Sequence, residues 1–276
     1  MSSLATEQRA AQGRDTPAGP GGLPPKFDAS LRLKELARKP LAEDTTKADV
    51  RVLNVSLYCY KSFPIRIFHA LALKDGVDSH VIFFKNNFTN DHLPISDVEL
   101  NLMRDLVRAI DPDVVMMSVM APYVPAARQV VSVIREVSPA KIVLGGKFPT
   151  ISPRDAMEFA DYACVGEGEL AVLSMFDRLR NSRDFRGIKG LWHKDDSGKV
   201  VDMGQEHLYE ALDDIPYPAI GERQMNFIEL DKLVTRDPEL DEEEALMMAG
   251  RGCVYLCSFC VNSLLIPMNR GNGRFV

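Results

Sequence analysis

Three of the five cysteines in this chain of 276 residues lie within one short stretch. Cys253, Cys257 and Cys260 form a Cys-x-x-x-Cys-x-x-Cys pattern in the segment AGRGCVYLCSFC. Thiolates are ligands for zinc and for iron–sulfur clusters, and in a reducing cytosol clustered cysteines more often bind metal or carry out redox chemistry than form structural disulfides. The spacing therefore indicates a metal site.

Three kinds of site can account for these thiols. A structural zinc site needs a fourth ligand, and neither cysteine nor histidine follows Cys260 in this chain. Inert core thiols are a second possibility, although a loop that begins at Gly252 and contains Ser258 is a poor place for them. We favour a four-iron, four-sulfur cluster, because three thiolates leave one iron open to bind another molecule, and Gly252 lets the backbone approach closely.

The residues before the cysteines alternate between short apolar runs and helical patterns. The apolar runs predict strands over residues 51–57, 79–84, 113–119, 141–146 and 161–166. Apolar positions at steps of three and four residues predict helices over 64–76, 96–110, 124–137, 152–160 and 169–180. We expect Ser96 and Ser152 to be N-caps. This alternation predicts an α/β fold with a Rossmann-like, doubly wound parallel sheet.

Composition divides the chain into four parts. Residues 1–48 are expected to be a disordered tail with a short helix over 31–39, and residues 49–182 are expected to be the Rossmann-like domain. Residues 183–244 predict a hairpin, which turns at DDSG, and a proline-bearing linker. Residues 245–276 begin a second unit, in which ALMMAGRG predicts a strand that runs directly into the cysteines.

Glycines and polar side chains gather where the predicted strands end. An open parallel sheet binds its ligand at the carboxyl ends of the strands, so these loops are the candidate binding site. Glycines there permit close approach of the backbone to a ligand, although they can also merely turn the chain. The candidates are Gly145, Gly146, Gly166 and Gly168, with polar contacts from Ser118, Tyr123 and Thr150.

Charge and hydropathy exclude two classes of function. The net charge is −6 and the basic residues are scattered, so the chain has no basic stripe that could follow a nucleic-acid backbone. The longest apolar run, VVMMSVM, is far shorter than the roughly 20 residues that cross a bilayer, and the polar N-terminus does not resemble a signal peptide. We therefore expect a cytoplasmic protein with no nucleic-acid partner and no membrane span.

The segment GCVYLCSFC resembles the cluster-binding loop of the radical S-adenosylmethionine (SAM) enzymes, including the aromatic Phe259 before the last cysteine. The resemblance implies that Cys253, Cys257 and Cys260 hold a [4Fe–4S] cluster whose open iron binds SAM. Reductive cleavage of SAM then gives a 5′-deoxyadenosyl radical, while Phe259 shields the cluster and approaches the adenine. An electron donor such as flavodoxin or ferredoxin is the implied partner.

The order of the motifs is similar to that of the cobalamin-binding radical SAM enzymes. GG-x-x-PT is followed by ADYACVGEGE, LDDIPYP and the cysteine loop, and the resemblance covers about residues 50–276. It implies that the Rossmann-like domain holds cobalamin on three loops at strand ends. The implied cobalamin site comprises Ser118, Tyr123, Gly145, Gly146, Phe148, Pro149, Thr150, Gly166, Glu167 and Gly168.

Two features depart from related cobalamin proteins. The chain lacks the Asp-x-His-x-x-Gly motif, whose histidine ligates cobalt in cobalamin domains of the mutase type. Phe148 stands where the radical family often has histidine, so an apolar ring is expected near the lower face of cobalt. The lower axial ligand is thus open.

The resemblance implies the N-terminal part of a cobalamin-dependent radical SAM enzyme, ending in the first strand and cluster loop of a partial (βα) barrel. Methyl transfer to an unactivated carbon of a small-molecule or natural-product substrate is the favoured reaction, with oxidative cyclisation as an alternative. A cobalamin- or metal-responsive regulator without catalysis is the other alternative. Because a full barrel takes about 250 residues, we expect this chain to be a fragment that is inactive alone.

Overall fold

The structure is a computed structural model. It describes residues 27–42, 44–46, 48–86, 94–244, 247–248, 250–255 and 257–269. The expected disordered tail therefore lies almost entirely outside the described residues. Within them, no helix is both long and apolar enough to cross a membrane.

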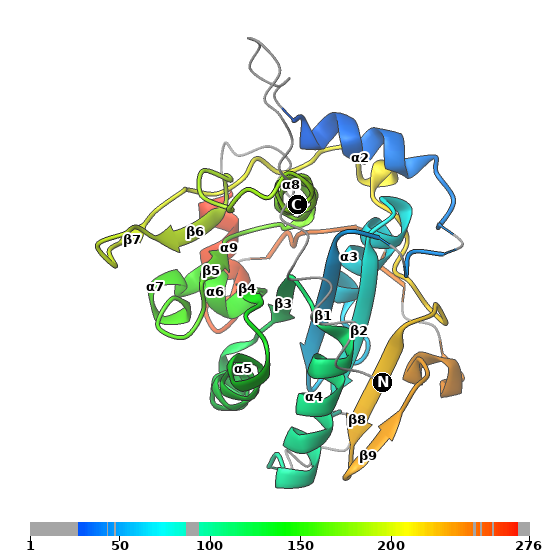
Figure 1. Cartoon of the computed structure of the whole chain (residues 1–276). Helices are drawn as coiled ribbons and strands as arrows, with labels where there is room; N and C mark the ends of the chain where they lie inside the picture. Colours follow the sequence, from blue (N-terminus) through cyan, green and yellow to red (C-terminus); the bar gives the residue numbers. More distant parts are fainter. Residues whose placement is uncertain are drawn as a thin grey trace, which may run out of the picture.

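One sheet of nine strands, in the order β7-β6-β5-β4-β3-β1-β2-β8-β9, organises the described chain (Figure 1). The strands from β5 to β8 in this order are parallel, and β6, β7 and β9 are antiparallel additions at the edges. The predicted α/β fold with a mostly parallel sheet is confirmed. The strands are β1 (Arg51–Leu57), β2 (Asp78–Phe84), β3 (Val114–Ser118), β4 (Lys141–Gly145), β5 (Tyr162–Cys164), β6 (Leu191–Lys194), β7 (Val200–Val201), β8 (Met225–Glu229) and β9 (Lys232–Val234).

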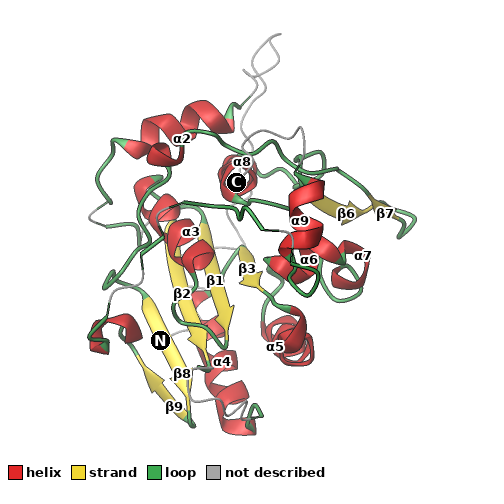
Figure 2. Cartoon of the chain, turned by 180° about the vertical axis from the view of Figure 1, so that it is seen from behind, coloured by secondary structure: helices red, strands yellow, loops and turns green. Residues whose placement is uncertain are grey.

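Helices cover both faces of the sheet, which explains why its central strands are buried on both sides (Figure 2). One apolar cluster joins the sheet to α4 (Asp97–Ile110), α5 (Val124–Val137), α6 (Lys147–Ile151) and α7 (Pro153–Ala156). A second cluster joins the other face to α2 (Ala29–Ala37), α3 (Phe63–Lys74) and α8 (Glu169–Arg180). This arrangement on two faces is that of a doubly wound domain.

Local sequence signals explain several helix ends. Ser96 caps α4 in a capping box, since its hydroxyl accepts from the Glu99 N–H and the Glu99 carboxylate accepts from the Ser96 N–H. Asp111 ends the same helix in the left-handed conformation, directly before Pro112. The other expected cap, Ser152, precedes the four-residue helix α7 but forms no capping hydrogen bond with its side chain.

The segment after α8 contains more strand than the sequence indicated. The predicted hairpin is confirmed as β6 and β7, and Asp195 organises its turn by accepting from the N–H groups of Ser197 and Lys199. The expected linker, however, contributes β8 beside β2 and then β9. Leu230 and Asp231 form the turn between these strands with positive φ. The turn lacks glycine and asparagine, so the usual hairpin signal is absent.

The predicted strand before the cysteines is wrong for the residues that the structure describes there. Residues 247–248 and 250–255 are in neither a strand nor a helix. A strand needs a neighbouring backbone to complete its hydrogen bonds, and within the described chain β7 and β9 already occupy the two edges of the sheet. A short helix, α9 (Asn262–Met268), follows the cysteines.

A buried histidine makes the domain sensitive to acid. His69 is fully buried, its Nε2 donates to the Arg223 carbonyl at 3.2 Å, and its Nδ1 accepts from the Ser79 hydroxyl at 2.8 Å. Burial lowers the pKa of His69 to about 4. The stabilisation that the neutral ring provides is therefore complete above the unfolded pKa of about 6.5 and is lost as the pH falls toward the folded value.

Between pH 7 and pH 5, we expect the free energy of unfolding of the parent chain to fall by about 2 kcal/mol more than that of His69→Gln. Glutamine keeps one donor and one acceptor but takes up no proton. Urea unfolding at the two pH values measures the difference. His207→Gln is the control, because His207 is exposed and its removal should leave the acid response unchanged. Equal acid losses in all three proteins would contradict the prediction.

Candidate functional site

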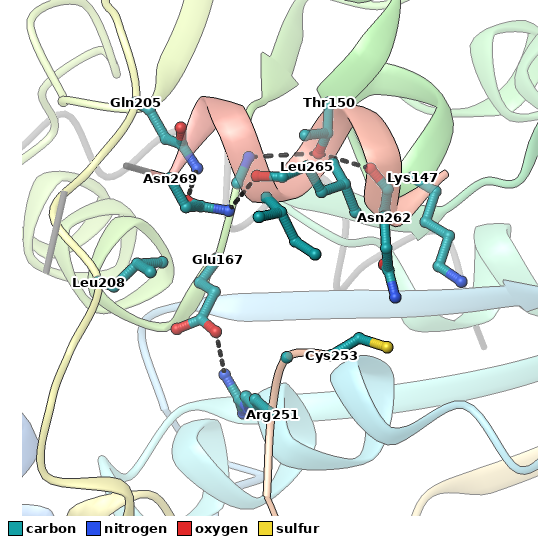
Figure 3. A pocket seen from close by; sticks show the side chains of 14 residues that line it. Lys147, Thr150, Glu167, Gln205, Leu208, Arg251, Cys253, Asn262, Leu265 and Asn269 are labelled. Atoms are coloured by element: carbon teal, nitrogen blue, oxygen red, sulfur yellow. Dashed lines mark hydrogen bonds and ion pairs between the residues drawn. The ribbon is translucent and has the colours of Figure 1, made fainter. Parts of the chain in front are cut away.

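Two adjoining cavities open where the strand-end loops meet the cysteine segment. The outer cavity has a volume of about 280 Å³ and lies between these loops and α9 (Figure 3). The inner cavity, also about 280 Å³, lies deeper, between α3, α8 and the ends of β3, β4 and β5. Residues shared by both walls are Gly146, Gly166, Glu167 and Arg251. The structure thus brings the candidate glycine loops and the cysteine segment into one place.

Glycine is required at two of these positions. Gly146 has φ +94°, and a Cβ there would lie 3.0 Å from the Val119 carbonyl oxygen and 3.1 Å from the Ser118 hydroxyl. Gly166 has φ +91°, and a Cβ would lie 2.7 Å from the Gln205 amide nitrogen. Positive φ is unfavourable for residues with a side chain, so the two glycines shape the walls of the site and do more than turn the chain.

Thr150 ties the two glycine loops together. Its hydroxyl donates to the Gly146 carbonyl at 2.8 Å and accepts from the Gly166 N–H at 3.2 Å. The side chain lines the outer cavity but is largely buried. The sequence predicts a polar contact from Thr150 to a ligand. In the structure, both hydrogen bonds of its hydroxyl instead join the ends of β4 and β5.

The inner cavity is mostly apolar, with the charged side chains of Glu167, Glu169 and Arg251 in its wall. Ser118, Gly145 and Gly168 lie in its wall, and the ring of Phe68 fills the space that a side chain at position 168 would need. Cys164 is also part of the wall, and burial raises the pKa of its thiol to about 12. The thiol stays neutral near pH 7 and packs as a small buried hydrophobe.

Three residues of the expected cobalamin site lie outside both cavities. Tyr123 stacks on Tyr58 with ring centroids 4.7 Å apart and lines a separate cavity. Phe148 and Pro149 are buried in α6, and Phe148 belongs to the apolar cluster on the α4 and α5 face. The expectation that the Phe148 ring faces a ligand at the strand ends therefore has no support in this geometry. Their neighbour Lys147, which was not expected in the site, does line the outer cavity, together with Gly146 and Thr150.

Other polar residues of the outer cavity carried no local signal in the sequence. Gln205 comes from the segment after β7, and its amide donates to the Asn269 side chain at 2.7 Å. Asn262 and Asn269 belong to α9 and its C-terminal end. Figure 3 shows these amides around the cavity mouth. Only the packing of α9 against the strand-end loops brings them there.

The cysteines are close in sequence but lie apart in this structure. Cys253 lines the outer cavity, Cys257 is exposed, and Cys260 is half-buried with its N–H donating to the Cys257 carbonyl at 3.0 Å. Within the described residues, no three potential metal ligands are grouped closely enough to hold an ion. Phe259 is 92 % exposed. The thiols fit a three-thiolate cluster in kind and number, but not in arrangement.

Arg251 connects the cysteine segment to the end of β5. Its Nη2 lies 2.6 Å from Oε1 of Glu169, and its Nη1 lies 3.4 Å from Oε1 of Glu167. Burial disfavours the charge of the guanidinium, but the attraction of these carboxylates outweighs burial and raises the pKa of Arg251. The arginine therefore stays charged. Sequence reasoning overlooked Arg251, although it lies two residues before Cys253.

Comparisons with known proteins concern the domain that carries the glycine loops. Residues 52–175 match the sequence model of the B12 binding domain family. The uncharacterized methyltransferase PH0819 of Pyrococcus horikoshii is 27 % identical over 172 residues, which are 61 % of this chain and 35 % of that protein. The anaerobic magnesium-protoporphyrin IX monomethyl ester cyclase of Rubrivivax gelatinosus is 28 % identical over 195 residues, which are 68 % of this chain and 32 % of the cyclase.

A solved structure shares the fold. The cobalamin-dependent S-adenosylmethionine radical enzyme OxsB, with aqua-cobalamin and S-adenosylmethionine bound, superposes with a TM-score of 0.50 at 15 % identity, over 61 % of this chain and 24 % of OxsB. The expected resemblance to the cobalamin-binding radical SAM enzymes is confirmed. The chain spans about a third of the length of the two curated relatives.

Proposed function

We propose that this chain, whose residues 52–175 form a B12-binding domain, is part of a cobalamin-dependent radical SAM enzyme that transfers a methyl group to an unactivated carbon. The observation that carries the proposal is the position of the cysteine segment, which lies directly against the glycine loops of the domain. The relative named a methyltransferase favours methyl transfer as the reaction. A small-molecule substrate and an electron donor of the flavodoxin or ferredoxin kind are the proposed partners.

The polarity of the two cavities suits parts of the cobalamin molecule. The corrin ring carries amide groups around its rim, and the outer cavity offers the amides of Gln205 and Asn262 together with Lys147. The apolar inner cavity suits a flat aromatic group such as the benzimidazole of the cobalamin tail. When bound, cobalamin supplies the methyl-carrying cobalt, whereas the protein binds and orients the cofactor and excludes water.

The cysteines suit an iron–sulfur cluster in chemistry alone. Three thiolates at the proposed positions would ligate three irons, but their sulfur atoms must first come together, so we derive no step from their present arrangement. Such coupling of ligand assembly to metal binding is common, because a preformed site is rare before the metal arrives. In this proposal, residues 253–260 order around the cluster.

Oxidative cyclisation is the second candidate reaction. It is favoured by the similarity to the magnesium-protoporphyrin ester cyclase, which extends over 68 % of this chain. Both reactions use the same two cofactors in our proposal, and the residues described here serve either. Isotopic labelling of the SAM methyl group distinguishes the two reactions in the enzyme that this chain is proposed to be part of, because methyl transfer places the label on the product and cyclisation does not.

The direct test is cofactor binding by the full chain. We expect the purified protein to retain about one aquacobalamin per chain after gel filtration, and anaerobic incubation with iron and sulfide to add about four irons. The triple variant Cys253→Ala, Cys257→Ala, Cys260→Ala is the matched control, which should keep cobalamin and lose the iron. No retained corrin would overturn the cobalamin assignment, and unchanged iron in the triple variant would overturn the cluster assignment.

A further inference from the structure

The cysteine segment is fastened to the B12-binding domain through one side chain that reaches across to two carboxylates. Arg251, two residues before Cys253, pairs with Glu167 in the loop after β5 and with Glu169 at the start of α8. Gly252, with φ +108°, separates Arg251 from Cys253. In Figure 3 the Cys253 side chain points away from the ion pair, so the segment turns between its anchor and its first thiol.

The domain side of this contact is rigid. Glu169 is the first residue of α8, where a carboxylate is favoured by the helix dipole, and its side chain is 7 % exposed. The residues that follow it pack into the apolar cluster shared with α3. Glu169 is therefore a fixed anchor. A planar guanidinium can hold two carboxylates at once, which a lysine cannot do with the same geometry.

The segment side is loosely packed. Val254 and Tyr255 are about 70 % exposed, and Phe259 is more exposed still. The hydrogen bonds described for this stretch include one within the stretch, which the Tyr255 N–H donates to the Cys253 sulfur at 3.5 Å. With little apolar burial, the position of such a segment depends strongly on the few polar contacts that it makes with the domain.

We infer that Arg251 is a positioning residue that fixes the cysteine loop against the cobalamin side of the site. Ordering of the cysteine loop is thereby coupled to ordering of the glycine loops. The coupling rests on the proposed function, since that function assigns a cofactor to each loop. The anchoring itself is a property of the chain without cofactors. It acts through Glu169 first and Glu167 second, in the order of their distances from the guanidinium.

Limited proteolysis of the full chain tests the anchoring. Chymotrypsin cleaves after aromatic residues, and Tyr255 and Phe259 lie within the loop, whereas Tyr217, which is 92 % exposed, lies outside it as an internal reference. We expect Arg251→Gln to raise cleavage at the two loop sites about tenfold relative to Tyr217, because the loop must detach to enter the protease. Glu169→Gln should act alike, and the double variant should add little, since both remove one interaction.

Two controls separate anchoring from general effects. Arg186→Gln removes the same charge from an exposed arginine that pairs with Asp196, and it should leave the cleavage ratio unchanged. Arg251→Lys keeps the charge but not the fork, and an intermediate ratio is expected. A ratio in Arg251→Gln within twofold of the parent value would overturn the inference.

Adding aquacobalamin tests the coupling. Binding should slow cleavage of the loop in the parent chain. Because Arg251 also lines both cavities, Arg251→Gln is compared at the same bound fraction of cobalamin, measured by gel filtration, and its loop should lack that protection. Equal protection in both proteins would overturn the coupling through Arg251. Failure of the parent chain to bind cobalamin would overturn the proposed function instead, and the cleavage ratios without cofactor would still decide whether Arg251 anchors the loop.

Discussion

Asp237→Ala is expected to lower the free energy of unfolding by about 3–5 kcal/mol, because it leaves the Arg66 guanidinium buried without its partner. Arg66 is 2 % exposed in α3, and its two terminal nitrogens donate to the two Asp237 carboxylate oxygens at 2.7 and 2.8 Å. Water cannot replace the lost carboxylate at such a site. The cost therefore includes the penalty of a buried charge that keeps only the more distant Glu239 carboxylate, whose Oε2 lies 3.6 Å from the Arg66 guanidinium.

The same pair fastens the segment that leads to the cysteines. Arg66 also donates to the Ala219 carbonyl at 2.8 Å, and Asp237 accepts from the N–H groups of Gly221 and Glu239 at 2.8 and 2.9 Å. Residues 219–239, which include β8 and β9, are thereby held against α3. Loss of Asp237 should loosen this whole segment, which explains why the expected effect exceeds that of one hydrogen bond.

Urea unfolding at pH 7 measures the effect. Asp196→Ala is the matched control, because Asp196 also pairs with an arginine, at 2.6 Å, but is 86 % exposed. We expect it to cost less than about 1 kcal/mol. Similar losses in Asp237→Ala and Asp196→Ala would contradict the prediction.

Gly146→Ala is expected to weaken cobalamin binding at least tenfold and to cost about 1–3 kcal/mol of stability. The added methyl group would meet the Val119 carbonyl oxygen at 3.0 Å and the Ser118 hydroxyl at 3.1 Å, in a backbone conformation that alanine disfavours. Relief of this contact must move the end of β3 away from the end of β4. Those two strand ends form part of the inner cavity wall, and Gly146 itself lines both cavities.

Gly76→Ala separates the two causes. Gly76 has a similar φ of +73°, but a Cβ there would meet nothing within 4 Å, and it lies in the turn between α3 and β2. Gel filtration with aquacobalamin and urea unfolding, applied to both variants, give affinity and stability. Gly76→Ala should lose some stability and no affinity. If Gly146→Ala retains the parent affinity, the site does not lie at these strand ends.

The sequence by itself determined the alternating strands and helices. β1, α5 and α8 have the predicted bounds, because burial on both faces and the helical period are written in neighbouring residues. It also singled out Cys253, Cys257 and Cys260 as candidate metal ligands, since the thiols and their spacing are local facts. It further indicated the edge of the sheet at which both cavities open, because parallel strands end at the same side of their sheet.

Only the tertiary structure decided which of these residues meet. β8 pairs with β2, so that Met225 lies opposite Val81, and no local pattern specifies a partner so far away in the chain. Likewise, Phe148 lies in the core while Lys147 faces the outer cavity, and Arg251 reaches Glu169 across the site. Such contacts follow from how packed layers place distant segments, and that packing depends on the whole chain at once.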